Sequence, residues 1–181
     1  MLLVVNRGLP MPEKRTLERA RRDKSEGKAP TTQAGEFIRE EMEHIRQGKH
    51  GARSSKQAIA IGLSKARRSG VDLPPPKKGT TTEKTRKSAA RAYARGHGAP
   101  ARSKPSAKRS RATTRALRRE GRSAASPRAL AKQTRSASAR RTRADRSASA
   151  RKAVRTKGPM ERSAAAKRAA RTREGRAGAH A

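Results

Sequence analysis

The feature that most constrains this chain is a long basic segment with almost nothing to bury. From Lys77 to the C-terminus, 33 Lys and Arg stand against five acidic residues, a net charge of +28 in 105 residues. The larger apolar side chains of this segment are Tyr93, Leu117, Leu130, Val154 and Met160. So little apolar surface does not offset the entropy of ordering the backbone. The composition therefore predicts a disordered tail over 77–181.

The preceding segment has a different character. Up to Pro76 there are 16 Lys and Arg and nine acidic residues, a net charge of +7, and Pro74-Pro75-Pro76 forms a stiff boundary. We expect residues 1–10 to be a floppy extension or a mis-annotated gene start, with Met11 as the true start. Residues 11–76 are expected to form a small helical module. The predicted fold class is mostly α and disordered: an N-terminal helical hairpin of two to three helices followed by the basic tail.

Two helices carry the clearest patterns in the first segment. In residues 33–47, five apolar side chains recur at helical spacing, while glutamates 36, 40, 41 and 43 occupy the other positions, where we expect them to serve solubility. Ser54 and Gln57 predict a capping box at the start of a helix over 54–68, and Gly70 predicts its end. A solvated helix is expected over 12–26, with a linker over 27–32. Residues 159–173 are expected to become helical when their charge is neutralised.

One stretch of the module resembles a known family. Residues 48–70 read GKHGARSSKQAIAIGLSKARRSG, and residues 31–47 read TTQAGEFIREEMEHIRQ. Together they resemble an uncharacterised family of small basic bacterial proteins, a domain of unknown function with KQAIAIGLSKAR as its core. The resemblance implies a bacterial origin and a start at Met11, and it carries no catalytic residues. Separately, the tail is similar in composition to linker-histone tails, although its 23 Arg and 10 Lys depart from their Lys-dominated composition.

The charge distribution predicts that phosphates are the ligands of this chain. Each Lys or Arg that neutralises a phosphate releases a condensed counterion, and Arg adds bidentate contacts. Base stacking requires aromatic side chains, and the tail contains one, Tyr93. We therefore expect binding to the nucleic-acid backbone with little sequence readout. The predicted nucleic-acid-binding residues are Arg53, Lys56, Lys65, Arg67, Arg68, Arg118, Arg119, Arg135, Arg140, Arg141, Arg143, Arg146, Arg151, Lys152, Arg155, Lys167, Arg168 and Arg171.

Other kinds of site find little support in the sequence. The chain has no Cys, and its four histidines, His44, His50, His97 and His180, are dispersed and expected to be solvated, so no metal site and no cofactor are predicted. No enclosing pocket is expected around the clustered glutamates, and an enzyme is not predicted. No apolar run approaches the about 20 residues that a membrane span needs.

The predicted function is that of a non-enzymatic, histone-like, nucleoid-associated protein of the bacterial cytoplasm that binds DNA without strong sequence preference. An RNA-binding or ribosome-associated protein is the first alternative, because Arg-rich segments suit RNA equally well. A protein-interaction or stress-related module, with the tail as an electrostatic anchor, is the second. A helix-turn-helix with residues 54–68 as recognition helix is a sharper option, and the module is a possible homodimer interface.

Overall fold

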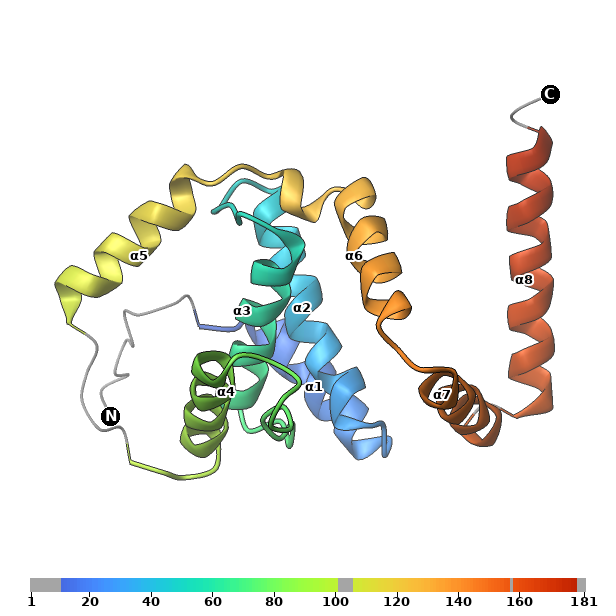
Figure 1. The fold of residues 1–181 in the computed structure, drawn as a ribbon, viewed down its shortest axis with the longest axis horizontal. Helices are drawn as coiled ribbons and strands as arrows, with labels where there is room; N and C mark the ends of the chain where they lie inside the picture. The colour runs from blue at the N-terminus through green and yellow to red at the C-terminus, as the bar shows by residue number, and fades with distance from the viewer. Residues whose placement is uncertain (1–10, 101–105, 157, 179–181) are drawn as a thin grey trace. The chain divides into compact units, whose positions relative to one another are not determined.

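The computed structural model describes residues 11–100, 106–156 and 158–178, and this part of the chain is largely helical (Figure 1). Its elements are α1 (Lys14–Ser25), α2 (Pro30–Arg46), α3 (Ser55–Arg68), α4 (Glu83–Gly96), α5 (Ala107–Arg119), the short 3₁₀ helix η1 (Ser123–Ala125), α6 (Pro127–Ala139), α7 (Arg143–Thr156) and α8 (Pro159–Gly178). The predicted fold class, a small hairpin followed by a disordered tail, is therefore wrong. The extension predicted over residues 1–10 lies outside the described residues.

Helix α2 begins earlier than its apolar pattern predicted. Pro30 occupies the first turn, where its fixed φ suits the helix and its missing N–H costs nothing. The predicted linker over 27–32 is consequently too long. The predicted stop at Gly70 is confirmed, and Gly48 ends α2 in the same way: the two glycines adopt φ values of +82° and +75°, a region that glycine enters without a steric penalty.

Helix α3 has the start that the sequence predicted. The Ser54 hydroxyl accepts a hydrogen bond from Gln57 N at 3.3 Å, and the Gln57 side chain accepts one from Arg53 N at 2.9 Å. The helix then packs closely on α2, because a Cβ built on Gly62 would lie 2.8 Å from the Ile38 Cα. Gly62 thus permits an approach of the two helices that a larger residue would obstruct.

Two small hydrophobic clusters hold the first part of the chain together. One gathers Phe37 of α2 with alanines of α1, α2 and α3 and with Val71. The other joins Met42 and Ile45 of α2 to Ala52, Ala58, Ala124 and Ala125, and Leu130 packs against it. Most members are alanines, so the core is formed by close approach of backbones rather than by large side chains.

Part of the expected tail belongs to this core. Ala124 and Ala125 of η1 are buried, and the Ala124 carbonyl accepts a hydrogen bond from the Ser55 hydroxyl at 2.6 Å. Gly51 N donates to the Leu117 carbonyl at 2.8 Å, and a Cβ on Gly51 would collide with the Glu120 carbonyl. The prediction of disorder counted large apolar residues, whereas these contacts use alanine, glycine and backbone polar groups.

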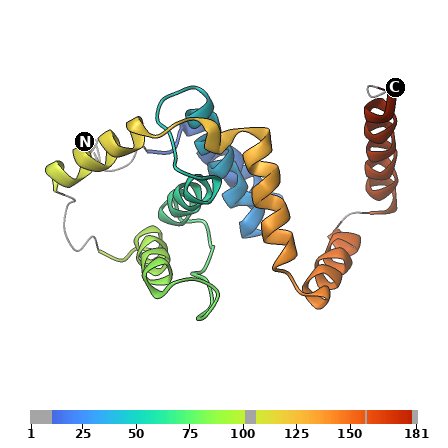
Figure 2. The ribbon, with the colours of Figure 1, turned by 45° about the horizontal axis from the view of Figure 1, so that its top comes forward.

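Helix α4 is also part of the packed structure. It lies beside α3 in both views of the ribbon (Figures 1 and 2), and its Ala89 and Ala92 are buried. Its last residue, Gly96, approaches so closely that an added Cβ would lie 1.9 Å from the Arg67 carbonyl. The Tyr93 hydroxyl donates to the Asp72 carboxylate at 2.6 Å across this contact.

The chain divides into two compact units, Met1–Gln133 and Thr134–Ala181. In the second unit, helices α7 and α8 bury none of their described side chains. They rest on their own backbone hydrogen bonds and on a high content of alanine, the residue with the best helix propensity. Helix α8 starts at the predicted Pro159 and extends past the predicted end. Among the described residues, no helix has the length and apolar character that crossing a membrane requires.

Candidate nucleic-acid interface

The second unit displays a dense set of exposed cations. Residues 134–181 contain 15 Lys and Arg and three acidic residues, a net charge of +12. Even with one-to-one pairing, three carboxylates neutralise at most three of these cations. The predicted site residues that lie exposed in this unit are Arg135, Arg140, Arg141, Arg143, Arg146, Arg151, Lys152, Arg155, Lys167, Arg168 and Arg171.

The cations of α7 and α8 do not form a single face. At about 100° per residue, positions 143, 146, 151, 152 and 155 point to more than half of the helix circumference. Serine and alanine fill most of the positions between them, together with Asp145 and Val154. The Thr142 hydroxyl accepts a hydrogen bond from Asp145 N at 3.1 Å and donates one to the Asp145 side chain at 2.8 Å. This capping interaction lowers the pKa of the Asp145 carboxyl, first through the side-chain hydrogen bond from Thr142.

Four of the predicted cations lie exposed in the first unit. Arg53 precedes α3 and Lys56 lies in its first turn, whereas Arg118 and Arg119 end α5. These four side chains are accessible to a ligand, but they belong to two different segments of the unit.

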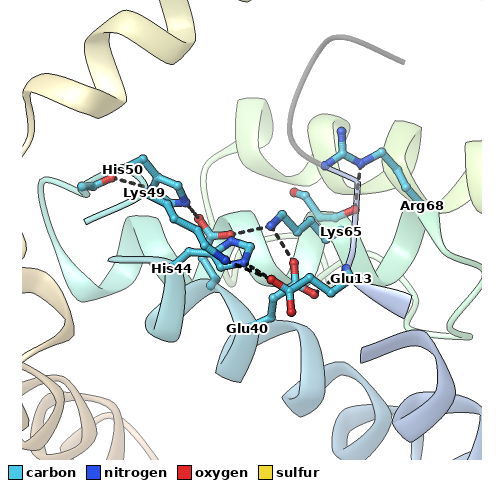
Figure 3. A network of polar contacts seen from close by, with 10 residues as sticks. Glu13, Glu40, His44, Lys49, His50, Lys65 and Arg68 are labelled. Atoms are coloured by element: carbon cyan, nitrogen blue, oxygen red, sulfur yellow. Dashed lines mark hydrogen bonds and ion pairs between the residues drawn. The ribbon is translucent and has the colours of Figure 1, made fainter. Parts of the chain in front are cut away.

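Lys65 has a different environment from the other predicted cations. Its side chain is 1% exposed, and its Nζ lies 3.1 Å from Glu40 Oε1 and 2.8 Å from Glu41 Oε2 (Figure 3). Both glutamates are also buried, so the expectation that they serve helix solubility is wrong. Burying a charge is costly unless an opposite charge is near, and the lysine and the two glutamates meet that need for one another.

The guanidinium groups of Arg67 and Arg68 also bond to groups of the protein itself. Arg67 is buried and donates to the carbonyls of Leu73 at 3.0 Å and Pro74 at 3.4 Å. Arg68 is half-buried and donates to the Ser64 carbonyl at 3.1 Å. Burial lowers the pKa of both guanidinium groups, and the nearby charge of Arg95 lowers that of Arg68 further. Together with Lys65, Arg67 holds the end of α3 to its surroundings, whereas the Arg68 hydrogen bond lies within the helix.

A second polar cluster joins α2 to the residue before α1. Glu13 Oε1 contacts His44 Nε2 at 2.8 Å and Lys49 Nζ at 3.1 Å, and Glu13 N donates to Glu40 Oε2 at 3.0 Å. The hydrogen bond from His44, followed by that from Lys49, lowers the pKa of Glu13 to about 2. His44 is buried, so the prediction of a solvated histidine is wrong at this position.

The same region brings together a possible set of metal ligands. Ligand atoms of Glu41, His44 and His50 all lie within 4.8 Å of one another. Sequence reasoning missed this group because it looked for closely spaced histidines. The available sign was Glu41-x-x-His44 on one helix face, with His50 just beyond the Gly48 turn.

The aromatic residue of the basic segment is engaged inside the first unit. Tyr93 donates its hydroxyl hydrogen to Asp72 and stacks on His97, with ring centroids 4.0 Å apart. The hydrogen bond to Asp72 raises the pKa of the Tyr93 hydroxyl. These contacts occupy both the hydroxyl and one face of the ring.

Comparison with known proteins adds one match. Residues 21–78 match DUF6496, a family of unknown function, over about a third of the chain. The match includes all of α2 and α3, so this segment has the family resemblance that residues 31–70 indicated. No curated protein and no solved structure is detectably similar to the chain.

Proposed function

We propose that this chain is a non-enzymatic, nucleoid-associated protein of the bacterial cytoplasm that binds DNA largely without sequence preference. The observation that carries the proposal is the second unit, whose sequence has 15 Lys and Arg against three carboxylates and whose helices α7 and α8 bury none of their described side chains. The excess of cations over carboxylates in this unit suits it to the binding of phosphates. RNA binding and a homodimer remain predictions.

The mechanism is counterion release from the nucleic-acid backbone. Each phosphate that a cation neutralises lowers the slope of log K against log salt by about 0.9 for duplex DNA. Because the cations of α7 surround the helix, they suit contact with phosphates in more than one orientation. The engagement of Tyr93 with Asp72 and His97 argues against base stacking as a main source of affinity.

The first test is a salt series of binding measurements with the full chain. In one variant, the five cations of α7 are replaced by Gln: Arg143, Arg146, Arg151, Lys152 and Arg155. A matched variant replaces five exposed cations of the first unit that are not predicted site residues by Gln: Lys14, Arg15, Arg21, Lys24 and Lys78. We expect the α7 variant to lose up to about 4.5 from the magnitude of the salt slope and the matched variant to lose much less.

Three results would decide against this proposal. Equal losses in the two variants would mean that charge acts diffusely and that the second unit is not the binding element. Binding that persists at about 0.5 M salt, or that requires one sequence, would contradict counterion-driven contact. Preference for structured RNA over duplex DNA in direct competition would favour the ribosome-associated alternative.

A further inference from the structure

Glu41, His44 and His50 form a cluster whose chemistry the proposed function does not use. Glu41 and His44 lie on one face of α2, and His50 follows the Gly48 turn. Their ligand atoms lie within 4.8 Å of one another, and Glu41 and His44 are buried. They line a cavity of about 230 Å³ in the first unit, which Thr114, Leu117 and Arg118 of α5 also border.

The buried Glu41 carboxylate has a cation nearby but no hydrogen bond. Its Oε1 lies 3.2 Å from His50 Nε2 and its Oε2 lies 2.8 Å from Lys65 Nζ, but neither oxygen has a hydrogen bond of acceptable geometry. A buried acceptor without a hydrogen bond costs about 1–3 kcal/mol or more if charged. A cation bound on the Oε1 side would satisfy this carboxylate while Oε2 keeps its contact with Lys65.

The two histidines have the supporting contacts that metal-binding imidazoles require. His50 Nδ1 lies 3.1 Å from the Gly51 carbonyl, and its donation there leaves Nε2 with a lone pair. His44 Nε2 lies 2.8 Å from Glu13 Oε1, and in the tautomer that donates to Glu13, Nδ1 carries the lone pair. Metal-ligating histidines commonly donate their second N–H to a carbonyl or a carboxylate in this way.

We propose that Glu41, His44 and His50 bind one divalent transition-metal ion, with Zn²⁺ as the best-suited ion. Two imidazoles and one carboxylate form a typical zinc ligand set, with a fourth position left to water or an added ligand. Two ligand atoms of a tetrahedral zinc site lie about 3.4 Å apart. The distance of 3.2 Å between Glu41 Oε1 and His50 Nε2 is close to this value. His44 therefore makes the larger adjustment, and the adjoining cavity accommodates the fourth ligand.

Local charge is compatible with this ion. Three carboxylates, those of Glu13, Glu40 and Glu41, balance the charges of Lys49, Lys65 and the cavity-lining Arg118 when the histidines are neutral. The bound ion would link α2 to the segment that follows it. This inference is independent of nucleic-acid binding, because none of its ligands belongs to the proposed interface.

The test is calorimetric titration of the full chain with ZnCl₂ in phosphate-free buffer after chelator treatment. We expect one ion per chain and an affinity at least about 10-fold lower in the His44→Gln and His50→Gln variants, because even supporting residues change metal affinity 10–100-fold. The double variant His97→Gln/His180→Gln keeps only the cluster histidines and should bind as the wild type does. Co²⁺ should give a visible absorption band that His50→Gln abolishes.

Two results would overturn the inference. One is the absence of a one-to-one binding event in the folded wild-type chain. The other is unchanged affinity in His50→Gln or a loss of affinity in the double variant. If His44→Gln or His50→Gln fails to fold, Glu13→Gln still decides, because the Glu13 side chain is 46% exposed whereas those of His44 and His50 are 7% and 10% exposed. Glu13 acts as a positioning residue, so Glu13→Gln should weaken Zn²⁺ binding about 10-fold without changing the stoichiometry.

Discussion

Helices α3 and α8 are both rich in alanine and in basic residues, but they are stabilised in different ways. In α3, Ala58 and Ala66 are buried against neighbouring helices, and Lys65 is enclosed with two glutamates. In α8, none of the described side chains is buried, and Lys167 and Arg168 lie in solvent. Both helices carry alanines and cations, but α3 also carries Ile59 and Leu63, which pack against the core clusters, so the role of a cation here depends on what surrounds it. The first unit, which contains α3, is stabilised by packing, whereas α8 of the second unit is stabilised by helix propensity.

The largest effect is expected from Lys65→Met in the packed unit. Removal of the ammonium group leaves Glu40 and Glu41 buried without their cation, and breaking a buried pair in this way costs about 3–5 kcal/mol. The free energy of unfolding, measured by denaturant titration, checks this expectation. Lys56→Met removes an exposed cation from the same helix and should stay within about 0.5 kcal/mol. Similar losses in both variants would contradict the distinction between internal and surface cations.

How far the sequence predicts the structure differs between these two regions. The Ser54 cap and the glycine stop at Gly70 are local features, and both are confirmed, although the Gln57 side chain bonds to Arg53 N rather than to Ser54 N. The sequence predicted disorder where the structure has α4, η1 and α6. The reason is that alanine contributes to a core only where backbones come close. The contacts of Ala124 with Ser55 and of Ala125 with Arg46 follow from such an approach between residues that are 69 and 79 positions apart in the chain. Local periodicity carries no information about it.

The candidate sites show the same limit. The exposed cations of the second unit follow directly from composition, because too few apolar groups are present there to cover them. The fate of Lys65 depends instead on Glu40 and Glu41 facing inward, which their amphipathic pattern did not indicate. The ligand group of Glu41, His44 and His50 depends in addition on Glu13 and Gly51, which reach it from outside α2.

A matched pair of Ala→Gly substitutions sharpens the comparison. In both Ala58→Gly and Ala166→Gly, the loss of helix propensity costs about 1 kcal/mol, and Ala58 additionally loses a buried methyl group worth about 0.8 kcal/mol. Because Ala58 belongs to a core cluster, its variant should lower the melting temperature of the first unit. Ala166 is exposed, so its variant should reduce only local protection of α8 in hydrogen exchange. A lowered melting temperature of the first unit in Ala166→Gly would show that the two units are energetically coupled.

The smallest effect concerns Glu13, which is exposed but bonded to His44 and Lys49. These hydrogen bonds lower its folded-state pKa from 4.5 to about 2. A depressed carboxyl pKa contributes stability above the unfolded-state value, and that contribution is lost as pH falls from about 4.5 through about 2. Glu13→Gln should therefore destabilise the first unit slightly at neutral pH, and its difference from the wild type should shrink across this window.

Denaturant titrations of the wild type and the variant from pH 6 down to about pH 2 measure this difference. The matched control is Glu43→Gln, which removes one exposed negative charge from α2 without touching Glu13, His44 or Lys49. If the two variants show the same pH dependence, the change reflects net charge alone, since the loss of any carboxylate makes this basic protein more positive. If only Glu13→Gln changes the pH dependence of stability, that dependence arises from the hydrogen bonds that join Glu13 to His44 and Lys49.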